Sequence, residues 1–202
     1  MMQNGFMAGL AALALTGCVS INDYSDGAPA AAPVQNRSLQ SVSADGSVPT
    51  DVRRTTIIVR DMERSLAFWR DVLGLRVNYD TGVELSGVNL PVGEPGTQAR
   101  LVLLNANDDF IGWIGLMELV DPPLDEPPYP RRLGVGSAVI VVNTDDVDAR
   151  CAAAAMAPGV TVTAQPNMQT YPSRDGGEPI RVKGCNILDP DGIAVEINQL
   201  LN

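Results

Sequence analysis

The fold is decided by residues 51–75, which read DVRRTTIIVRDMERSLAFWRDVLGL. Apolar and polar side chains alternate along residues 52–60, and this period of two predicts a half-buried strand. Asp61 is then a good N-cap, and apolar residues recur at helical spacing up to Gly74, a residue type that often follows the end of a helix. The stretch therefore predicts a strand that leads directly into an amphipathic helix.

The same order of elements occurs twice along the chain. Strand-like runs follow the first helix at residues 75–79, 98–105 and 111–120. The second half has a β-branched strand at 137–143, a helix capped by Asp145 or Asp146, and strand-like runs at 160–164, 180–188 and 193–198. A Pro-rich linker, residues 121–135, joins the halves. We therefore predict an α+β domain over residues 51–202, with βαβββ modules at about residues 52–120 and 136–200.

An apolar segment near the N-terminus predicts export. Residues 6–15 are apolar but too few to span a bilayer as a permanent helix. They lead into Leu15-Thr16-Gly17-Cys18, which resembles the lipobox of bacterial lipoproteins. The resemblance implies that residues 1–17 are a signal peptide and that Cys18 is diacylated and becomes the mature N-terminus. The alternative is a buried N-terminal helix that contains a cysteine.

Residues 18–50 are typical of a flexible tether. They are rich in Ala, Ser, Asp, Gly and Pro, and they show no sustained period. Two acyl chains on one cysteine suffice for stable anchoring. Val19 follows the cysteine where Asp would favour the inner membrane, so the lipoprotein resemblance implies the outer membrane, facing the periplasm. We expect a lipid-anchored protein of the bacterial cell envelope.

Composition limits the partners and the chemistry. The net charge is −10, with 13 Arg and one Lys, so nucleic acid and anionic lipid surfaces are poor partners, and membrane contact is expected through the anchor only. The chain has no histidine, so it lacks the usual general base and the commonest metal ligand. Cys151 and Cys185 can pair in an oxidising compartment, but their apolar contexts favour buried free thiols.

Three segments resemble the vicinal oxygen chelate superfamily, which includes glyoxalase I, extradiol dioxygenases and bleomycin-resistance proteins. Residues 59–75 resemble the opening of such a domain, residues 144–149 match the strand-to-helix junction of its second module, and residues 188–197 resemble its last hairpin. The resemblance implies curved mixed sheets around a cavity, and a possible homodimer with swapped modules. It does not assign a function, because the superfamily spans many chemistries.

The resemblance also implies where a metal would bind. Superfamily enzymes take their ligands from the first and last strands of each module, and these positions fall on Arg54, Glu118, Val139 and Glu196. Two carboxylates, a cation and a valine do not supply the three ligands of a catalytic transition metal. We predict a cavity without metal or other cofactor, in which Arg54 takes the place of the ion. A weak divalent-metal site on Glu118 and Glu196 is the alternative.

Strand alternation supports this geometry. Arg54 shares a face with Thr56, and Glu196 shares a face with Asn198, opposite the apolar positions of each strand. We therefore expect Arg54, Glu118 and Glu196 to converge on one cavity. A purely structural ion pair between Arg54 and Glu118 is the alternative.

Other residues are assigned by their position along the chain. Val139 completes the predicted binding residues on the first strand of the second module. Tyr171 and Arg174 lie in the loop 165–178, a region that covers the cavity in related folds, so we expect them in a lid. Trp69 lies on the apolar stripe of the first helix and is expected in the core.

The favoured function is binding of a small molecule without metal by a lipid-anchored envelope protein. The second hypothesis is a lyase or isomerase, or a dioxygenase-like enzyme, that acts on an α-oxo or enediol-type small molecule. In that case Glu118 or Glu196 is the general base and Arg54 stabilises an enolate. The third is a non-catalytic envelope protein that presents a surface to a partner.

Overall fold

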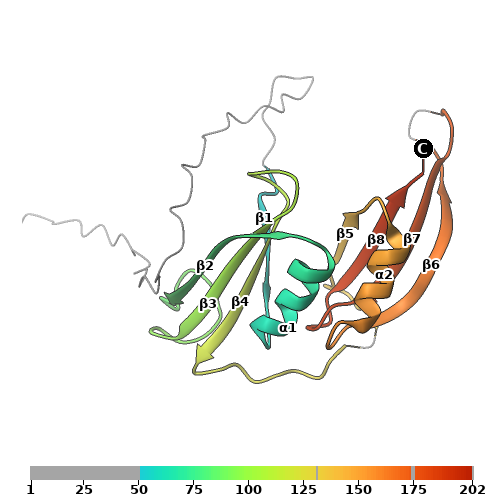
Figure 1. The fold of residues 1–202 in the computed structure, drawn as a ribbon. Helices are drawn as coiled ribbons and strands as arrows, with labels where there is room; N and C mark the ends of the chain where they lie inside the picture. Colours follow the sequence, from blue (N-terminus) through green and yellow to red (C-terminus); the bar gives the residue numbers. More distant parts are fainter. Residues whose placement is uncertain (1–50, 131, 174–175, 202) are drawn as a thin grey trace, which may run out of the picture.

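The computed structural model of the protein describes residues 51–130, 132–173 and 176–201. Its architecture is α+β, with two four-stranded mixed sheets and few helices, as the sequence predicted. Figure 1 shows the two sheets side by side, with β1 and β5 at the edges that face each other. The predicted signal peptide, Cys18 and the tether lie outside the described residues.

The first sheet has the strand order β1-β4-β3-β2. Strand β1 pairs with β4 in parallel, and the other two pairings are antiparallel. The helical segment between β1 and β2 consists of α1 (Met62–Leu66) and η1 (Ala67–Val72). The strands are β1 (Arg54–Ile58), β2 (Arg76–Glu84), β3 (Gln98–Asn105) and β4 (Trp113–Asp121).

The second sheet repeats this plan with the order β5-β8-β7-β6. Strand β5 pairs with β8 in parallel, and α2 (Val147–Met156) follows β5. The strands are β5 (Val139–Asn143), β6 (Thr161–Tyr171), β7 (Ile180–Leu188) and β8 (Ala194–Leu200). The repeat of the element order and of the parallel edge pairing agrees with two modules of the same design.

The first helix begins where the sequence predicted and continues as a π-helix. The Asp61 side chain caps it by accepting a hydrogen bond from the backbone N–H of Arg64 at 3.0 Å. From residue 67 the turns are π-helical, and the N–H of Leu73 bonds the carbonyl of Phe68, five residues back. Phe68 and Trp69 are both fully buried, so the prediction that Trp69 lies in the core is confirmed.

One hydrophobic core joins the helix-covered faces of both sheets. It includes Ile57 and Leu116 from the first sheet, Val195 and Ile197 from the second, and Leu66 from α1. We call the opposite side of each sheet its helix-free face. Because the core is shared, each module buries apolar surface that it would expose alone.

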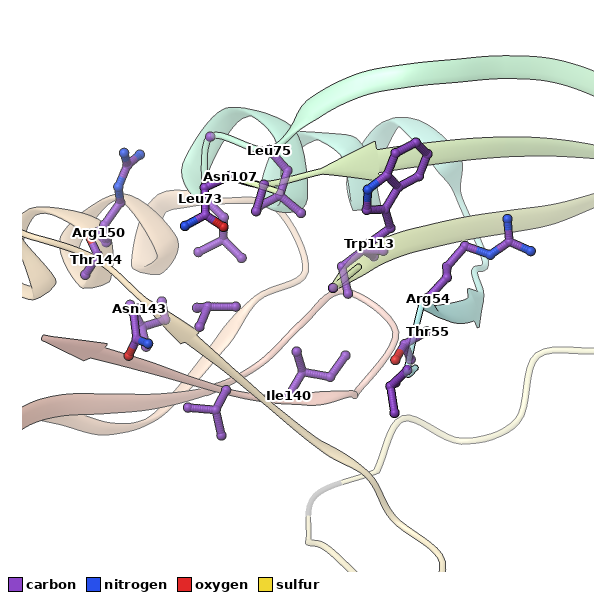
Figure 2. Close-up of a pocket in the computed structure, with 18 of the residues that line it drawn as sticks. Arg54, Thr55, Leu73, Leu75, Asn107, Trp113, Ile140, Asn143, Thr144 and Arg150 are labelled. Carbon is purple, nitrogen blue, oxygen red and sulfur yellow. The ribbon is translucent and has the colours of Figure 1, made fainter. Parts of the chain in front are cut away.

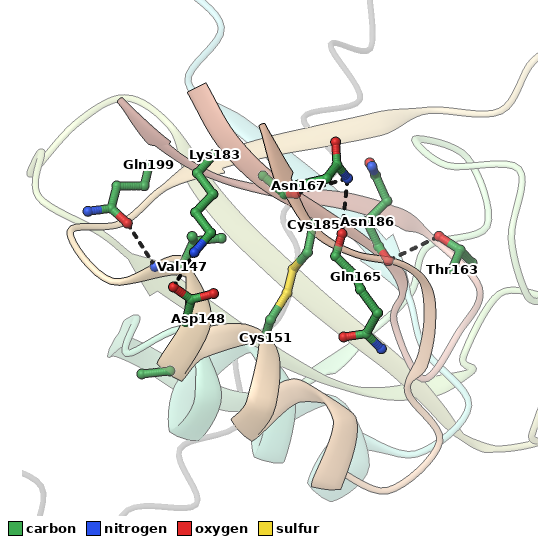
Figure 3. The surroundings of a disulfide bond; sticks show 12 residues. Val147, Asp148, Cys151, Thr163, Gln165, Asn167, Lys183, Cys185, Asn186 and Gln199 are labelled. Carbon is green, nitrogen blue, oxygen red and sulfur yellow. Dashed lines mark hydrogen bonds and ion pairs between the residues drawn. A yellow bond between two sulfur atoms is a disulfide. The ribbon is translucent and has the colours of Figure 1, made fainter. Parts of the chain in front are cut away.

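Cys151 of α2 and Cys185 of β7 form a disulfide in this core, with their Cα atoms 6.6 Å apart (Figure 3). The sequence had favoured free thiols, and that expectation is wrong. The reason is packing, because α2 lies against β7 and brings together two cysteines that are 34 residues apart.

The turn between β7 and β8 joins the second module to the first through hydrogen bonds. Asp191 accepts hydrogen bonds from the backbone N–H of Arg60 and from the Ser65 hydroxyl, both at 2.8 Å. The indole N–H of Trp69 donates to Oδ2 of the fully buried Asp189 at 3.1 Å. Burial raises the pKa of Asp189 from 3.8 to about 6, against the lowering effect of the backbone N–H of Ile193.

Two strands are longer than the sequence predicted. Strand β2 extends to Glu84, and β6 extends to Tyr171, so much of the predicted 165–178 lid is strand. The pairing of β6 with β7 shifts register between Ala164 and Asn167. Pro166 lies in this irregularity, where its missing N–H breaks no regular ladder bond. The proline therefore interrupts the pattern in the sequence without ending the strand.

Across the described ranges, no helix combines the length and the apolar character needed to span a membrane.

Candidate functional site

The helix-free face of the first sheet carries Arg54 and Thr56, as strand alternation predicted. Gly115 of β4 lies beside them, and a Cβ added to it would be 2.7 Å from Thr56 Oγ1 and 3.3 Å from Arg54 Cδ. Glycine at this position therefore allows both side chains to lie across β4.

Glu118 lies on the other face of the same sheet. Its neighbour Met117 packs with Val83, Ala99 and Leu119 on the helix-free face, so Glu118 points toward the start of α1. Burial raises the pKa of Glu118, the backbone N–H of Met62 lowers it, and the negative charge of Asp61 raises it again. The prediction that Glu118 joins Arg54 in one cavity is therefore wrong. No ion pair joins Arg54 to Glu118 within the described part of the chain.

Glu196 and Asn198 lie together on the helix-free face of the second sheet. The Asn198 amide donates from Nδ2 to Glu196 Oε1 at 2.9 Å. On the neighbouring strand β5, Val139, Val141 and Asn143 pair with Ala194, Glu196 and Asn198. The predicted sharing of one face by Glu196 and Asn198 is therefore correct, and Val139 lies on the adjacent strand.

Tyr171 ends strand β6, and its hydroxyl donates to Oε1 of Gln169. Arg174, the other predicted lid residue, lies outside the described residues. Tyr171 therefore belongs to the sheet rather than to a loop over a cavity.

A cavity of about 810 Å³ lies between the facing edges of β1 and β5 (Figure 2). Arg54 and Trp113 line one side, and Asn143, Thr144 and Arg150 line the other. Neither Glu118 nor Glu196 lines this cavity among its described residues. The structure thus separates the three predicted residues, and of these three only Arg54 lines the cavity. The remaining lining residues are Val52, Thr55, Leu73, Gly74, Leu75, Ala106, Asn107, Gly112, Ile114, Ile140, Val141, Val142, Asp145 and Ile197.

Two arginine residues line the cavity, and their interactions differ. Arg150 donates from one guanidinium nitrogen to the carbonyl of Val72 at 2.5 Å, so it links α2 to the end of η1. Arg54 is exposed and forms no ion pair with any described residue. Asp145 is the single carboxylate among the described lining residues. Arg54 therefore lines the cavity without an anionic partner among the described residues.

The strand edges add backbone groups to the cavity walls. The carbonyl of Arg53 accepts a hydrogen bond from Trp113 of β4, and the N–H of Val59 donates to Met117 of β4. Because peptide groups alternate in direction along a strand, those of Arg54 and Thr56 point to the free edge of β1. On the opposite wall, the N–H of Thr144 bonds the carbonyl of Asn198 in β8. By the same alternation, Val141 and Asn143 turn their peptide groups toward the cavity.

Comparison with known proteins agrees with this architecture. The model of the Glyoxalase/Bleomycin resistance protein/Dioxygenase superfamily matches residues 52–197. The chain belongs to this superfamily. A glyoxalase family protein from Bacillus cereus matches with a TM-score of 0.62 and 15% identity, over 79% of this chain and 100% of that one. A glyoxalase/dioxygenase from Nostoc punctiforme matches with a TM-score of 0.51 and 20% identity, over 82% of this chain and 100% of that one. The search of curated proteins gave no match.

The residues at the superfamily's ligand positions do not fit a metal ion. Arg54 and Val139 offer no ligand atom that suits a cation. Glu118 lies on the helix-covered face of the first sheet, whereas Glu196 lies on the helix-free face of the second. In the described ranges, no three Asp, Glu, His or Cys side chains form a group that could hold one.

The sequence missed several residues of the cavity. Leu73, Leu75, Asn107 and Arg150 come from segments that carry no site signal of their own. Leu73 and Arg150 meet because η1 packs against α2. The free edge position of β1 and β5 could have pointed to this region, since both are first strands of their modules.

Proposed function

We propose that the protein binds an acidic organic small molecule in the cavity between β1 and β5, without metal. The observation that carries the proposal is that Arg54 lines a cavity of about 810 Å³ and has no ion-pair partner among the described residues. Arginine binds carboxylates bidentately through its planar fork of N–H donors. An acidic ligand would supply the anion that Arg54 lacks.

The walls of the cavity support an organic rather than an inorganic ligand. Its volume is within the range of small-molecule sites, which combine apolar walls with a few polar groups. Leu73, Leu75 and Trp113 supply apolar surface, and Asn143 and Thr144 supply hydrogen-bonding groups. Trp113 is buried, and its indole N–H donates to the carbonyl of Asp108 at 3.1 Å. This hydrogen bond fixes the orientation of the ring.

Benzoate tests this proposal, with benzamide as its neutral analogue. Isothermal titration of the full chain is expected to show saturable benzoate binding, and Arg54→Gln is expected to weaken it at least about tenfold, since a charge-assisted hydrogen bond contributes roughly 1.5–3 kcal/mol. Benzamide is expected to bind more weakly because it carries no charge.

Arg53→Gln is the matched control. The Arg53 guanidinium lies over the Phe110 ring at 4.8 Å, and Arg53 does not line the cavity, so this variant is expected to bind benzoate like the wild type. Equal weakening by the two substitutions, or equal affinity for benzamide and benzoate, would exclude specific anion binding at Arg54.

We further propose that Cys18 is lipidated and holds the domain at the outer membrane, facing the periplasm. The lipobox-like Leu15-Thr16-Gly17-Cys18 supports this location. The Cys151–Cys185 disulfide also supports it, because disulfides persist in oxidising compartments. In a bacterial host, the wild type is expected to incorporate labelled palmitate and to sediment with membranes. Cys18→Ser is expected to lose the label. Equal labelling of both proteins would contradict lipidation at Cys18.

A further inference from the structure

The first sheet and the linker form a second cavity, of about 350 Å³, which we call the linker cavity. Ile58 of β1, Leu119 of β4 and Val92 of the loop between β2 and β3 line it, together with residues 123–127 of the linker. None of these residues lines the cavity that Arg54 lines. The volume of the linker cavity is within the range of small-molecule sites.

Much of the wall of the linker cavity is apolar and open to water. Ile58 is 39% exposed and Leu124 is 46% exposed, although both have large aliphatic side chains. Pro123 and Pro127 add further apolar surface. A ligand that covers such side chains removes their surface from water, which stabilises the complex. The cavity is therefore suited to the apolar body of a small molecule.

Arg60 fixes the linker at this cavity. Its guanidinium donates to the carbonyl of Pro127 at 2.8 Å and to the carbonyl of Asp191 at 3.0 Å. Its Nε lies 3.5 Å from the carboxylate of Glu126. All three guanidinium nitrogens thus have an oxygen partner in the protein. Arg60 therefore serves to hold the linker against the end of β1, and it is not free to bind an anionic ligand.

The charged residues that line the linker cavity favour a cation. They are three acidic residues, Asp125, Glu126 and Asp191, and one basic residue, Arg60, so the lining has an excess of negative charge. Asp191 already accepts hydrogen bonds from the backbone N–H of Arg60 and from the Ser65 hydroxyl, and Glu126 pairs with Arg60. Asp125 is exposed and forms no ion pair with any described residue. A cationic group on a ligand would supply the partner that Asp125 lacks.

We propose that the linker cavity is a second binding site, which takes a small apolar molecule that carries an ammonium group. The apolar body contacts Ile58, Leu119 and Leu124, and the ammonium group pairs with Asp125. A charge-assisted hydrogen bond between an ammonium group and a carboxylate is stronger than one between neutral groups, so a neutral analogue binds less tightly. An anion would meet the excess of carboxylates and is disfavoured.

2-Phenylethylammonium is the probe, and 2-phenylethanol is its neutral analogue. In an NMR titration of the full chain, labelled with ¹³C at its Ile, Leu and Val methyl groups, the probe is expected to shift the Leu119 and Leu124 methyl signals saturably. 2-Phenylethanol is expected to bind about twofold to fivefold more weakly, because an ion pair at an exposed carboxylate contributes only modestly. No saturable shift at Leu119 and Leu124, or equal affinities for the two compounds, would overturn the proposal.

Two pairs of variants locate the site. Leu124→Ala is expected to weaken binding of the probe at least about threefold, because it removes apolar contact. Leu133→Ala makes the same change at an exposed linker residue outside the cavity and is expected to bind like the wild type. Asp125→Asn is expected to weaken binding about twofold to fivefold, whereas Asp109→Asn, at an exposed residue outside the cavity, is expected to have no effect. Equal affinities within either pair would exclude the proposed site.

The result is independent of the cavity that Arg54 lines. That cavity is tested with an anion and with Arg54→Gln, whereas the linker cavity is tested with a cation and with Leu124 and Asp125. Arg54→Gln is expected to bind 2-phenylethylammonium like the wild type. Failure of one proposal therefore leaves the other standing.

Discussion

Replacing Asp189 with alanine is expected to lower the free energy of unfolding by about 3–5 kcal/mol near pH 5. The carboxyl group is fully buried and accepts hydrogen bonds from Trp69 Nε1 and from the backbone N–H groups of Asp191 and Ile193. Alanine leaves these donors without an acceptor in the contact between the two modules. Urea unfolding of both proteins at the same pH measures the difference.

The destabilisation caused by Asp189→Ala is expected to decrease as the pH rises. Burial raises the pKa of Asp189 from 3.8 to about 6 in the folded protein, so protonation stabilises the fold, fully below 3.8, and this stability is lost as the pH rises through 6. Between pH 5 and pH 7.5 the wild type should lose about 1.4 kcal/mol from this group, a loss that the alanine variant lacks. A difference that stays constant with pH would show that Asp189 has an ordinary pKa.

Asp71→Ala is the control for this prediction. Asp71 is exposed and pairs with its neighbour Arg70, so its loss is expected to change stability by less than about 0.5 kcal/mol. If both substitutions destabilise the protein equally, the contact between Trp69 and Asp189 does not hold the modules together.

Opening the Cys151–Cys185 disulfide is expected to cost about 3–4 kcal/mol. The bond closes a loop whose ends are 34 residues apart, and a loop of that length restricts the unfolded chain by this amount in the chain-entropy description. Urea unfolding with and without reductant measures the effect.

The double variant Cys151→Ala, Cys185→Ala serves as the reference. Its midpoint is expected to be the same with and without reductant, because the remaining Cys18 lies outside the disulfide. Peptide mapping after alkylation under native conditions is expected to find both residues linked in the untreated protein. Free thiols at both positions would contradict the bond.

The order of elements could be read from the chain because local signals coincide. The Asp61 cap, the alternation in residues 52–60 and the turn at residues 189–192 each depend on side chains a few positions apart. Strands β3 and β7 therefore have the predicted bounds, Gln98–Asn105 and Ile180–Leu188. The end of β6 was missed because Pro166 lies in a register shift that only the pairing with β7 creates.

The face of Glu118 could not be read in the same way. Residues 113–117 of β4 are buried on both faces, so the strand is a continuous apolar run without a period of two. Strand β8 is different, since Val195 and Ile197 alternate with Glu196 and Asn198. The sequence therefore predicted the face of Glu196 correctly and the face of Glu118 wrongly, and neither residue lines the cavity beside Arg54.

The sequence by itself determined the superfamily, the two repeated modules and the residue type at each ligand position, because these depend on neighbouring residues and on composition. Only the tertiary structure decided that Arg54 lines a cavity between two strand edges, whereas Glu118 and Glu196 are not among its described lining residues. It also decided that Trp69 of the first module bonds Asp189 of the second. The contact between Trp69 and Asp189 joins residues that are 120 positions apart, and no local pattern in the chain specifies the register or the angle at which such segments meet.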